Sequence, residues 1–159
     1  MDAPRFITLE AFAVVGVEDD AYKIDEVDPG FYDLWMNRFM SREPEVRPQS
    51  QDGVCYGVWF GAPGSDISKG RYLAGMQALE PTFVPEGWVK RTIPAARYAV
   101  FEATLDLIGE TTEQALDVWL PASGYQYDGD KPRLDYMGPD TTGPESPVSV
   151  WIPVVPRTT

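Results

Sequence analysis

The two halves of this chain repeat one another, and the repeat narrows the folds that are open to it. The segment Phe12–Val15 (FAVV) returns as Tyr98–Phe101 (YAVF), and Asp33–Met36 (DLWM) returns as Asp117–Leu120 (DVWL), at nearly equal offsets. Each copy puts a β-branched and aromatic stretch ahead of a helix-like stretch. We therefore expect a single domain over residues 1–159 that contains a duplicated unit, at about 5–79 and 88–155.

The first half predicts the order β-α-β-β. Residues 5–17 are rich in β-branched and aromatic side chains and indicate a strand, bent at 9–11. Asp28 and Pro29 are suited to begin a helix that ends at Glu43-Pro44. Apolar residues recur in it at helical spacing: Phe31, Leu34, Trp35 and Phe39. Two more strands are expected at 54–60 and 71–78.

The second half predicts the same order. Residues 88–103 indicate a strand with a kink at 93–95. Thr111 and Gln114 form a candidate capping box for a second helix, which ends at Pro121. Strands are then expected at 134–137 and 148–154.

Together the two units predict an α+β fold. We expect a pseudo-twofold antiparallel sheet with two helices on one face and a ligand cleft on the other. The seam between duplicated halves is a common place for a small-molecule pocket.

Composition excludes several classes of function. The chain has 25 acidic and 13 basic residues and a formal net charge of −12, which repels phosphate backbones, so nucleic acid is not expected as a direct partner. With no histidine and the single Cys55, the common zinc sites and the Ser/His and Cys/His nucleophile pairs are excluded. We expect no metal and no cofactor. The absence of a long apolar run or a leader favours a cytoplasmic protein without membrane contact.

An ordered set of short motifs resembles a known family. The motifs are Tyr56–Val58, Tyr72–Gly75, Ile93–Ala95, Tyr98–Phe101, Trp119–Pro121, Ser123–Tyr125 and Trp151–Val154. In this order they resemble the GyrI-like effector-binding domain, which is also the sensor part of AraC-type and MerR-type multidrug regulators. The chain looks like a stand-alone member without a DNA-binding domain. It is similar to cationic-drug-binding proteins of integron cassettes. The resemblance implies a role in multidrug recognition or transcription regulation.

The resemblance implies a hydrophobic cleft for small compounds, often cationic and aromatic. Family members commonly have a glutamate two positions before the last-strand aromatic, where this chain has Ser149. Asp135 lies at another position that is often acidic in the family, so a cleft acid is expected there. Glu102 is the second candidate.

Eight residues are the candidate ligand-binding set, and for each of them packing or surface exposure is the alternative. Aromatic rings attract cations, and a partly buried carboxylate adds a charge partner. Alternation along the last strand places Trp151 away from its aliphatic side and toward the cleft. The set is Tyr56, Trp59, Tyr72, Glu102, Trp119, Tyr125, Asp135 and Trp151.

Three functions remain open at this point. The first is a non-enzymatic binder of small hydrophobic or cationic molecules, as a monomer or homodimer. The second is a hydrolase of the same family that uses Asp135 or Glu102 to activate water, which would need a carboxyl pKa raised by burial. The third is a protein-interaction module, like the gyrase-inhibitor relatives, that presents its acidic surface to a basic partner.

Overall fold

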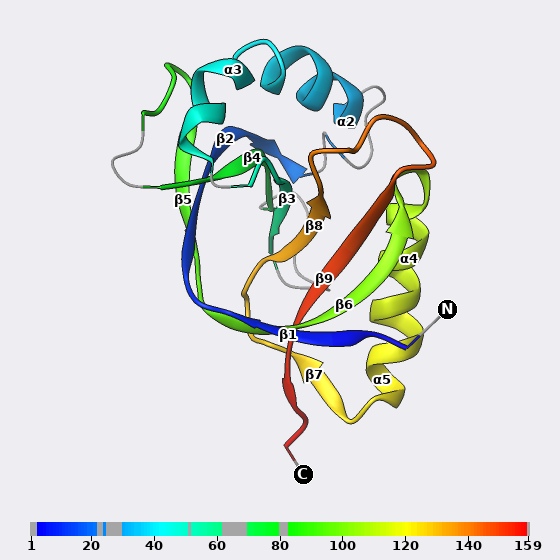
Figure 1. The fold of residues 1–159 in the computed structure, drawn as a ribbon. Coiled ribbons are helices and arrows are strands. Elements are labelled where there is room, and N and C mark those ends of the chain that lie inside the picture. Colours follow the sequence, from blue (N-terminus) through cyan, green and yellow to red (C-terminus); the bar gives the residue numbers. More distant parts are fainter. Residues whose placement is uncertain are drawn as a thin grey trace.

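A computed structural model describes residues 3–21, 24, 30–50, 52–61, 70–79 and 83–158. The strands of the described residues form one antiparallel sheet (Figure 1). Its strands are β1 (Arg5–Leu9), β2 (Phe12–Asp20), β3 (Cys55–Phe60), β4 (Arg71–Ala78), β5 (Val89–Ile93), β6 (Ala96–Thr104), β7 (Tyr125–Tyr127), β8 (Arg133–Met137) and β9 (Pro147–Pro156).

The sheet curls because each of its outer strands, β1 and β5, continues along the chain into a strand near the opposite edge. The strand order is β1-β6-β9-β8-β3-β4-β2-β5, and β7 pairs with β9. Strand β1 continues into β2, and β5 into β6, as two bent ribbons that pair with each other (Figure 1). The bends fall at residues 10–11 and 94–95, so both predicted kinks are confirmed. The curl gives the sheet an enclosed face and a face that carries the helices.

The helices cover two separate parts of the same face (Figure 1). The first group packs on β2 and β4 and consists of α2 (Gly30–Tyr32), η1 (Asp33–Phe39), α3 (Glu43–Val46) and η2 (Arg47–Gln49). The second packs on β6 and β9 and consists of η4 (Leu105–Leu107), α4 (Ile108–Gln114), η5 (Ala115–Trp119) and α5 (Leu120–Ala122). Both η1 and η5 are π-helical turns, and each contains the tryptophan of the repeated quartet.

The sequence predicted the strands better than the helix ends. The apolar face of β9 packs on the second helix group through Val150, Ile152 and Val154, as the alternation predicted. The capping box at Thr111 is wrong, because the helical segment already begins at Leu105 and Thr111 lies inside α4. Helical structure also continues past both predicted ends. Pro44 lies in the first turn of α3, where the N–H that proline lacks would have no partner within the helix, and Pro121 is the second residue of α5. The predicted cap at 28–29 lies outside the described residues.

One architectural expectation is corrected. The face opposite the helices is not an open cleft, because the curled sheet fills it with packed side chains, among them Tyr56, Tyr98, Leu134 and Trp151. Of the two cavities described below, the smaller borders this enclosed face at Glu102, Tyr136 and Ser149. The larger opens on the side that carries the helices.

Candidate functional site

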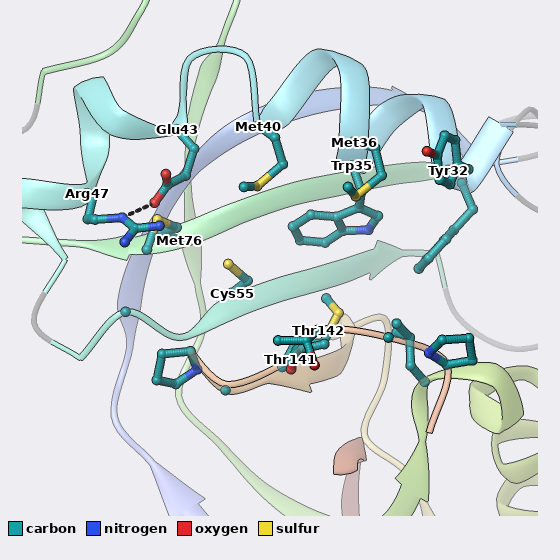
Figure 2. Close-up of a pocket in the computed structure, with 18 residues that line it drawn as sticks. Tyr32, Trp35, Met36, Met40, Glu43, Arg47, Cys55, Met76, Thr141 and Thr142 are labelled. Carbon is teal, nitrogen blue, oxygen red and sulfur yellow. Dashed lines mark hydrogen bonds and ion pairs between the residues drawn. The ribbon is translucent and has the colours of Figure 1, made fainter. Parts of the chain in front are cut away.

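A cavity of about 500 Å³ lies between the first helix group and the middle of the sheet (Figure 2). Strands β3, β4 and β8 form its floor, η1 lies along one side, and residues between 138 and 144 form the opposite wall. The volume is within the range of small-molecule sites. The helix-bearing face is hollow here because the first helix group and the 138–144 segment stand apart over β3 and β8.

Sulfur-containing side chains make up much of the lining. They come from η1 and its end, β3, β4 and β8: Met36, Met40, Cys55, Met76 and Met137. Met36 and Met40 are 51% and 43% exposed at the mouth, whereas Met76 and Met137 are buried in the floor. Thioether side chains are flexible and polarisable, so they adapt to ligands of different shape.

Aromatic side chains line one end of the cavity. Phe31, Tyr32 and Trp35 come from α2 and η1. Trp35 is 8% exposed and also packs edge-on against Phe39, with ring centres 5.1 Å apart. The aromatic end therefore combines a fixed indole with the more exposed ring of Tyr32, and both can contact an apolar ligand.

An ion pair stands at the other end (Figure 2). Glu43 and Arg47 are the charged residues of the lining, one helical turn apart. The Arg47 guanidinium donates a hydrogen bond from Nε to Glu43 Oε1. The Glu43 side chain is 4% exposed, while that of Arg47 is 67% exposed. The carboxylate is thus held inside the protein by a cation that reaches in from solvent.

Cys55 lies on the cavity floor between these ends (Figure 2). Burial, together with the nearby charge of Glu43, raises the pKa of its thiol to about 11, although Arg47 opposes the effect. At neutral pH the thiol is therefore protonated and a poor nucleophile. Cys55 contributes an apolar surface and not a reactive group.

A smaller cavity lies on the far side of the 138–144 wall. Its volume is about 270 Å³, and Gly138 and Thr141 line both cavities. Glu102 and Ser149, which pair across β6 and β9, also line the smaller one. The Glu102 carboxylate is exposed and forms an ion pair with Arg5. Of the predicted acids, it is the one placed at a cavity wall.

Asp135 lies behind the larger cavity and is fully buried. Trp59 donates a hydrogen bond from Nε1 to Asp135 Oδ2 over 3.0 Å. Burial raises the pKa of Asp135 to about 6, against the opposing hydrogen bond from Trp59 and the charge of Arg133. Among the described residues, Asp135 Oδ1 has no hydrogen-bond partner. The Asp135 carboxyl group is thus held where water cannot solvate its charge.

A short chain of contacts joins Asp135 to the cavity wall. The Trp59 ring lies 4.4 Å from that of Tyr72, which is also fully buried. Trp35, a lining residue, donates a hydrogen bond from Nε1 to Tyr72 Oη over 2.9 Å. Gly57 makes this arrangement possible, because a Cβ there would overlap the Tyr72 hydroxyl. Three of the predicted residues, Trp59, Tyr72 and Asp135, are therefore brought together one side chain behind the wall.

The other predicted aromatics lie apart from this cluster. Tyr56 and Trp151 are 5% exposed within the enclosed core, and each packs against Tyr136, with ring centres 5.6 and 5.4 Å away. Trp119 and Tyr125 stack on one another beside the second helix group. None of the eight predicted residues lines the larger cavity. Their role in ligand binding stays a prediction.

The candidate set from the sequence did not include the residues that line the cavity, although one signal for them was present. Tyr32, Met36 and Met40 recur at a spacing of four, which places them along one side of a helix. The predicted stripe of Phe31, Leu34, Trp35 and Phe39 accounts for the face that meets the sheet. A second apolar stripe on the same helix indicates a further contact surface.

The described residues contain neither a metal-binding cluster nor a helix that could span a membrane. Within the described residues, no group of three or more cysteine, aspartate or glutamate side chains is arranged to hold a metal ion. Over the same part of the chain, no helix combines the length and the apolar character that a membrane crossing requires.

The fold is that of an effector-binding domain. The chain belongs to the family of integron-associated effector binding proteins, whose pattern matches residues 5–154. This membership confirms the resemblance drawn from the short motifs. The transcriptional regulator BrlR of Pseudomonas aeruginosa is 30% identical over 158 residues, which are 94% of this chain and 54% of the regulator. The chain therefore spans about half the length of this relative.

Solved structures share the fold. The protein SAV2435, solved bound to tetraphenylphosphonium, has a TM-score of 0.70 at 15% identity, over 98% of this chain and 94% of its own. An integron cassette protein from the mobile metagenome of Vibrio cholerae has a TM-score of 0.61 at 18% identity, over 96% of each chain. Both likenesses bear on the fold alone.

Proposed function

We propose that this protein binds hydrophobic, positively charged small molecules in the cavity of about 500 Å³ and that it does so without catalysing a reaction. The observation that carries the proposal is the cavity itself, with an aromatic end and a thioether-lined body, in a chain of the effector-binding family. Such a lining suits an apolar ligand body, since it offers few polar groups that a ligand would leave unpaired.

Three features support a preference for cations. The net charge of −12 attracts cations through its summed field. The faces of Trp35 and Tyr32 attract a cation by about 0.5–2 kcal/mol each, depending on desolvation. Asp135 places a further carboxyl group behind the wall. The tetraphenylphosphonium bound to SAV2435 is a hydrophobic cation of the kind we propose.

We assign this chain a sensing or sequestering role and not a DNA-contacting one. Its acidic character opposes contact with phosphate backbones. Regulation would then depend on a partner or on a segment that makes the nucleic-acid contact.

Two probes of equal shape and opposite charge test the proposal. Tetraphenylphosphonium and tetraphenylborate would be titrated while tryptophan fluorescence is followed, because Trp35 lines the cavity. We expect saturable quenching by the cation with a Kd well below about 1 mM, and binding of the anion weaker by about tenfold or more. Absence of saturable binding, or a preference for the borate, would reject the proposal.

A matched pair of variants at one position locates the binding. Cys55→Phe fills the floor of the cavity, whereas Cys55→Ala leaves it open. We expect the phenylalanine variant to lose the cation and the alanine variant to keep it, with both folded by circular dichroism. Equal binding by the two variants would place the ligand outside this cavity.

A further inference from the structure

The ion pair at the end of the cavity is uneven in its burial. Glu43 is fixed in the first turn of α3 with its side chain 4% exposed, and Arg47 extends from solvent with 67% of its side chain exposed. Such a carboxylate needs a positive partner, because an unpaired charge in a buried position is strongly unfavourable. The arginine, in contrast, can leave and regain water at little cost.

We propose that Arg47 is a stand-in for the charged group of the ligand, and that a bound cation takes its place at Glu43. The inference rests on the proposed function and names the residue that selects the charge. A neutral ligand fills the apolar body of the cavity and leaves the Arg47–Glu43 pair intact. A cationic ligand reaches the carboxylate and releases the guanidinium to solvent.

The layout of the lining indicates the class of ligand. Glu43 and Arg47 lie at one end of the cavity, Met40 and Trp35 lie along its body, and Tyr32 lies at the far end (Figure 2). An elongated molecule with a cationic head and an apolar tail matches this order. The head meets Glu43, and the tail runs over the thioethers toward the aromatic end.

The inference predicts opposite effects for the two partners of one ion pair. In Arg47→Ala the internal competitor is gone, so the affinity for a cation rises. In Glu43→Gln the counter-charge is gone, so the preference for a cation is lost. A purely structural ion pair would instead weaken binding in both variants, because breaking it from either side would loosen the same end of the cavity.

Three probes that share an octyl chain separate charge from apolar fit: octyltrimethylammonium, octyl sulfonate and 1-octanol. Calorimetric titration of the wild type should rank the ammonium first. We expect Arg47→Ala to bind the ammonium about tenfold tighter with octanol unchanged, and Glu43→Gln to bind ammonium and octanol about equally. Tighter sulfonate binding in the wild type, lost in Arg47→Ala, would overturn the inference and make Arg47 the site of an anion.

A double variant guards against a folding artefact. Glu43→Gln with Arg47→Gln removes both charges and leaves no unpaired carboxylate, so it should fold and bind the ammonium and octanol alike. An unchanged ammonium preference in this folded variant would overturn the role of Glu43, while octanol binding there would leave the proposed cavity function standing. Failure of the wild type to bind any of the three probes would reject both proposals.

Discussion

The substitution Asp135→Asn tests the structure through its most deeply buried carboxyl group. Asp135 is fully buried, and burial raises its pKa from the ordinary value of 3.8 to about 6. The folded protein thus holds this proton more firmly than the unfolded chain does. The resulting stability is fully present below about pH 3.8 and is lost as the pH rises through about 6.

The size of the effect follows from the difference between the two pKa values. At about 1.4 kcal/mol per pH unit, a rise from 3.8 to about 6 corresponds to about 3 kcal/mol of unfolding free energy. Asparagine has nearly the same shape, and its carbonyl oxygen can accept the hydrogen bond from Trp59. Because it does not ionise, the variant should gain up to about 3 kcal/mol over the wild type between pH 4 and pH 7.

The assay is urea unfolding of both proteins across that pH range. The difference between them is the quantity of interest, because the changing net charge acts on both proteins alike. Glu102→Gln serves as the control, since it neutralises an exposed carboxylate paired with Arg5, and its difference should stay within about 1 kcal/mol.

A flat difference for Asp135→Asn would refute the reasoning. It would mean that water or a cation reaches the carboxylate in the folded protein, so that its charge is solvated. A difference that falls with rising pH would show that the charge of Arg133 outweighs burial, the reverse of the balance that the raised pKa reflects.

Two further predictions concern Gly57 and Cys55, which both lie in β3. Gly57→Ala should lower the unfolding free energy by about 2 kcal/mol or more, because the new Cβ would overlap the Tyr72 hydroxyl. As a control, Gly109 lies in α4 with open space around it, so Gly109→Ala should raise the unfolding free energy by about 0.5–1 kcal/mol. Urea midpoints would compare the two, and equal effects would contradict the packing. Cys55 should react slowly with iodoacetamide at pH 7.5 and faster as the pH nears 11, with protection by bound tetraphenylphosphonium; fast reaction at neutral pH would show an exposed thiolate.

The strands could be predicted because they depend on short local patterns, such as the alternation of apolar residues and the position of proline. The alternation from Val148 to Val154 reports which side of β9 is apolar, and Pro94 marks the bend between β5 and β6. The curl of the sheet could not be predicted from these patterns, because it depends on β1 pairing with β6 and β2 with β5 across long sequence separations. That curl fills the face where Trp151 was expected to meet a ligand.

The candidate site was harder to predict than the fold. Asp135 lies within a strand, as predicted, and its burial follows from packing between Trp59 and Tyr72, while its role as the cleft acid stays a prediction. Glu43 was not singled out, because a Glu-Pro pair ordinarily indicates an exposed helix end. Glu43 is buried because α3 adds a helical turn after η1. No local sequence pattern predicts this turn.

The four methionines around the cavity should make the proposed ligand binding sensitive to oxidants. Sulfoxide formation would convert a thioether into a polar, chiral group. Met36 and Met40 at the mouth would be modified first, while Met76 and Met137 are shielded within the sheet. Mild peroxide would therefore make the cavity mouth polar. It would abolish the binding of hydrophobic compounds at concentrations too low to unfold the domain.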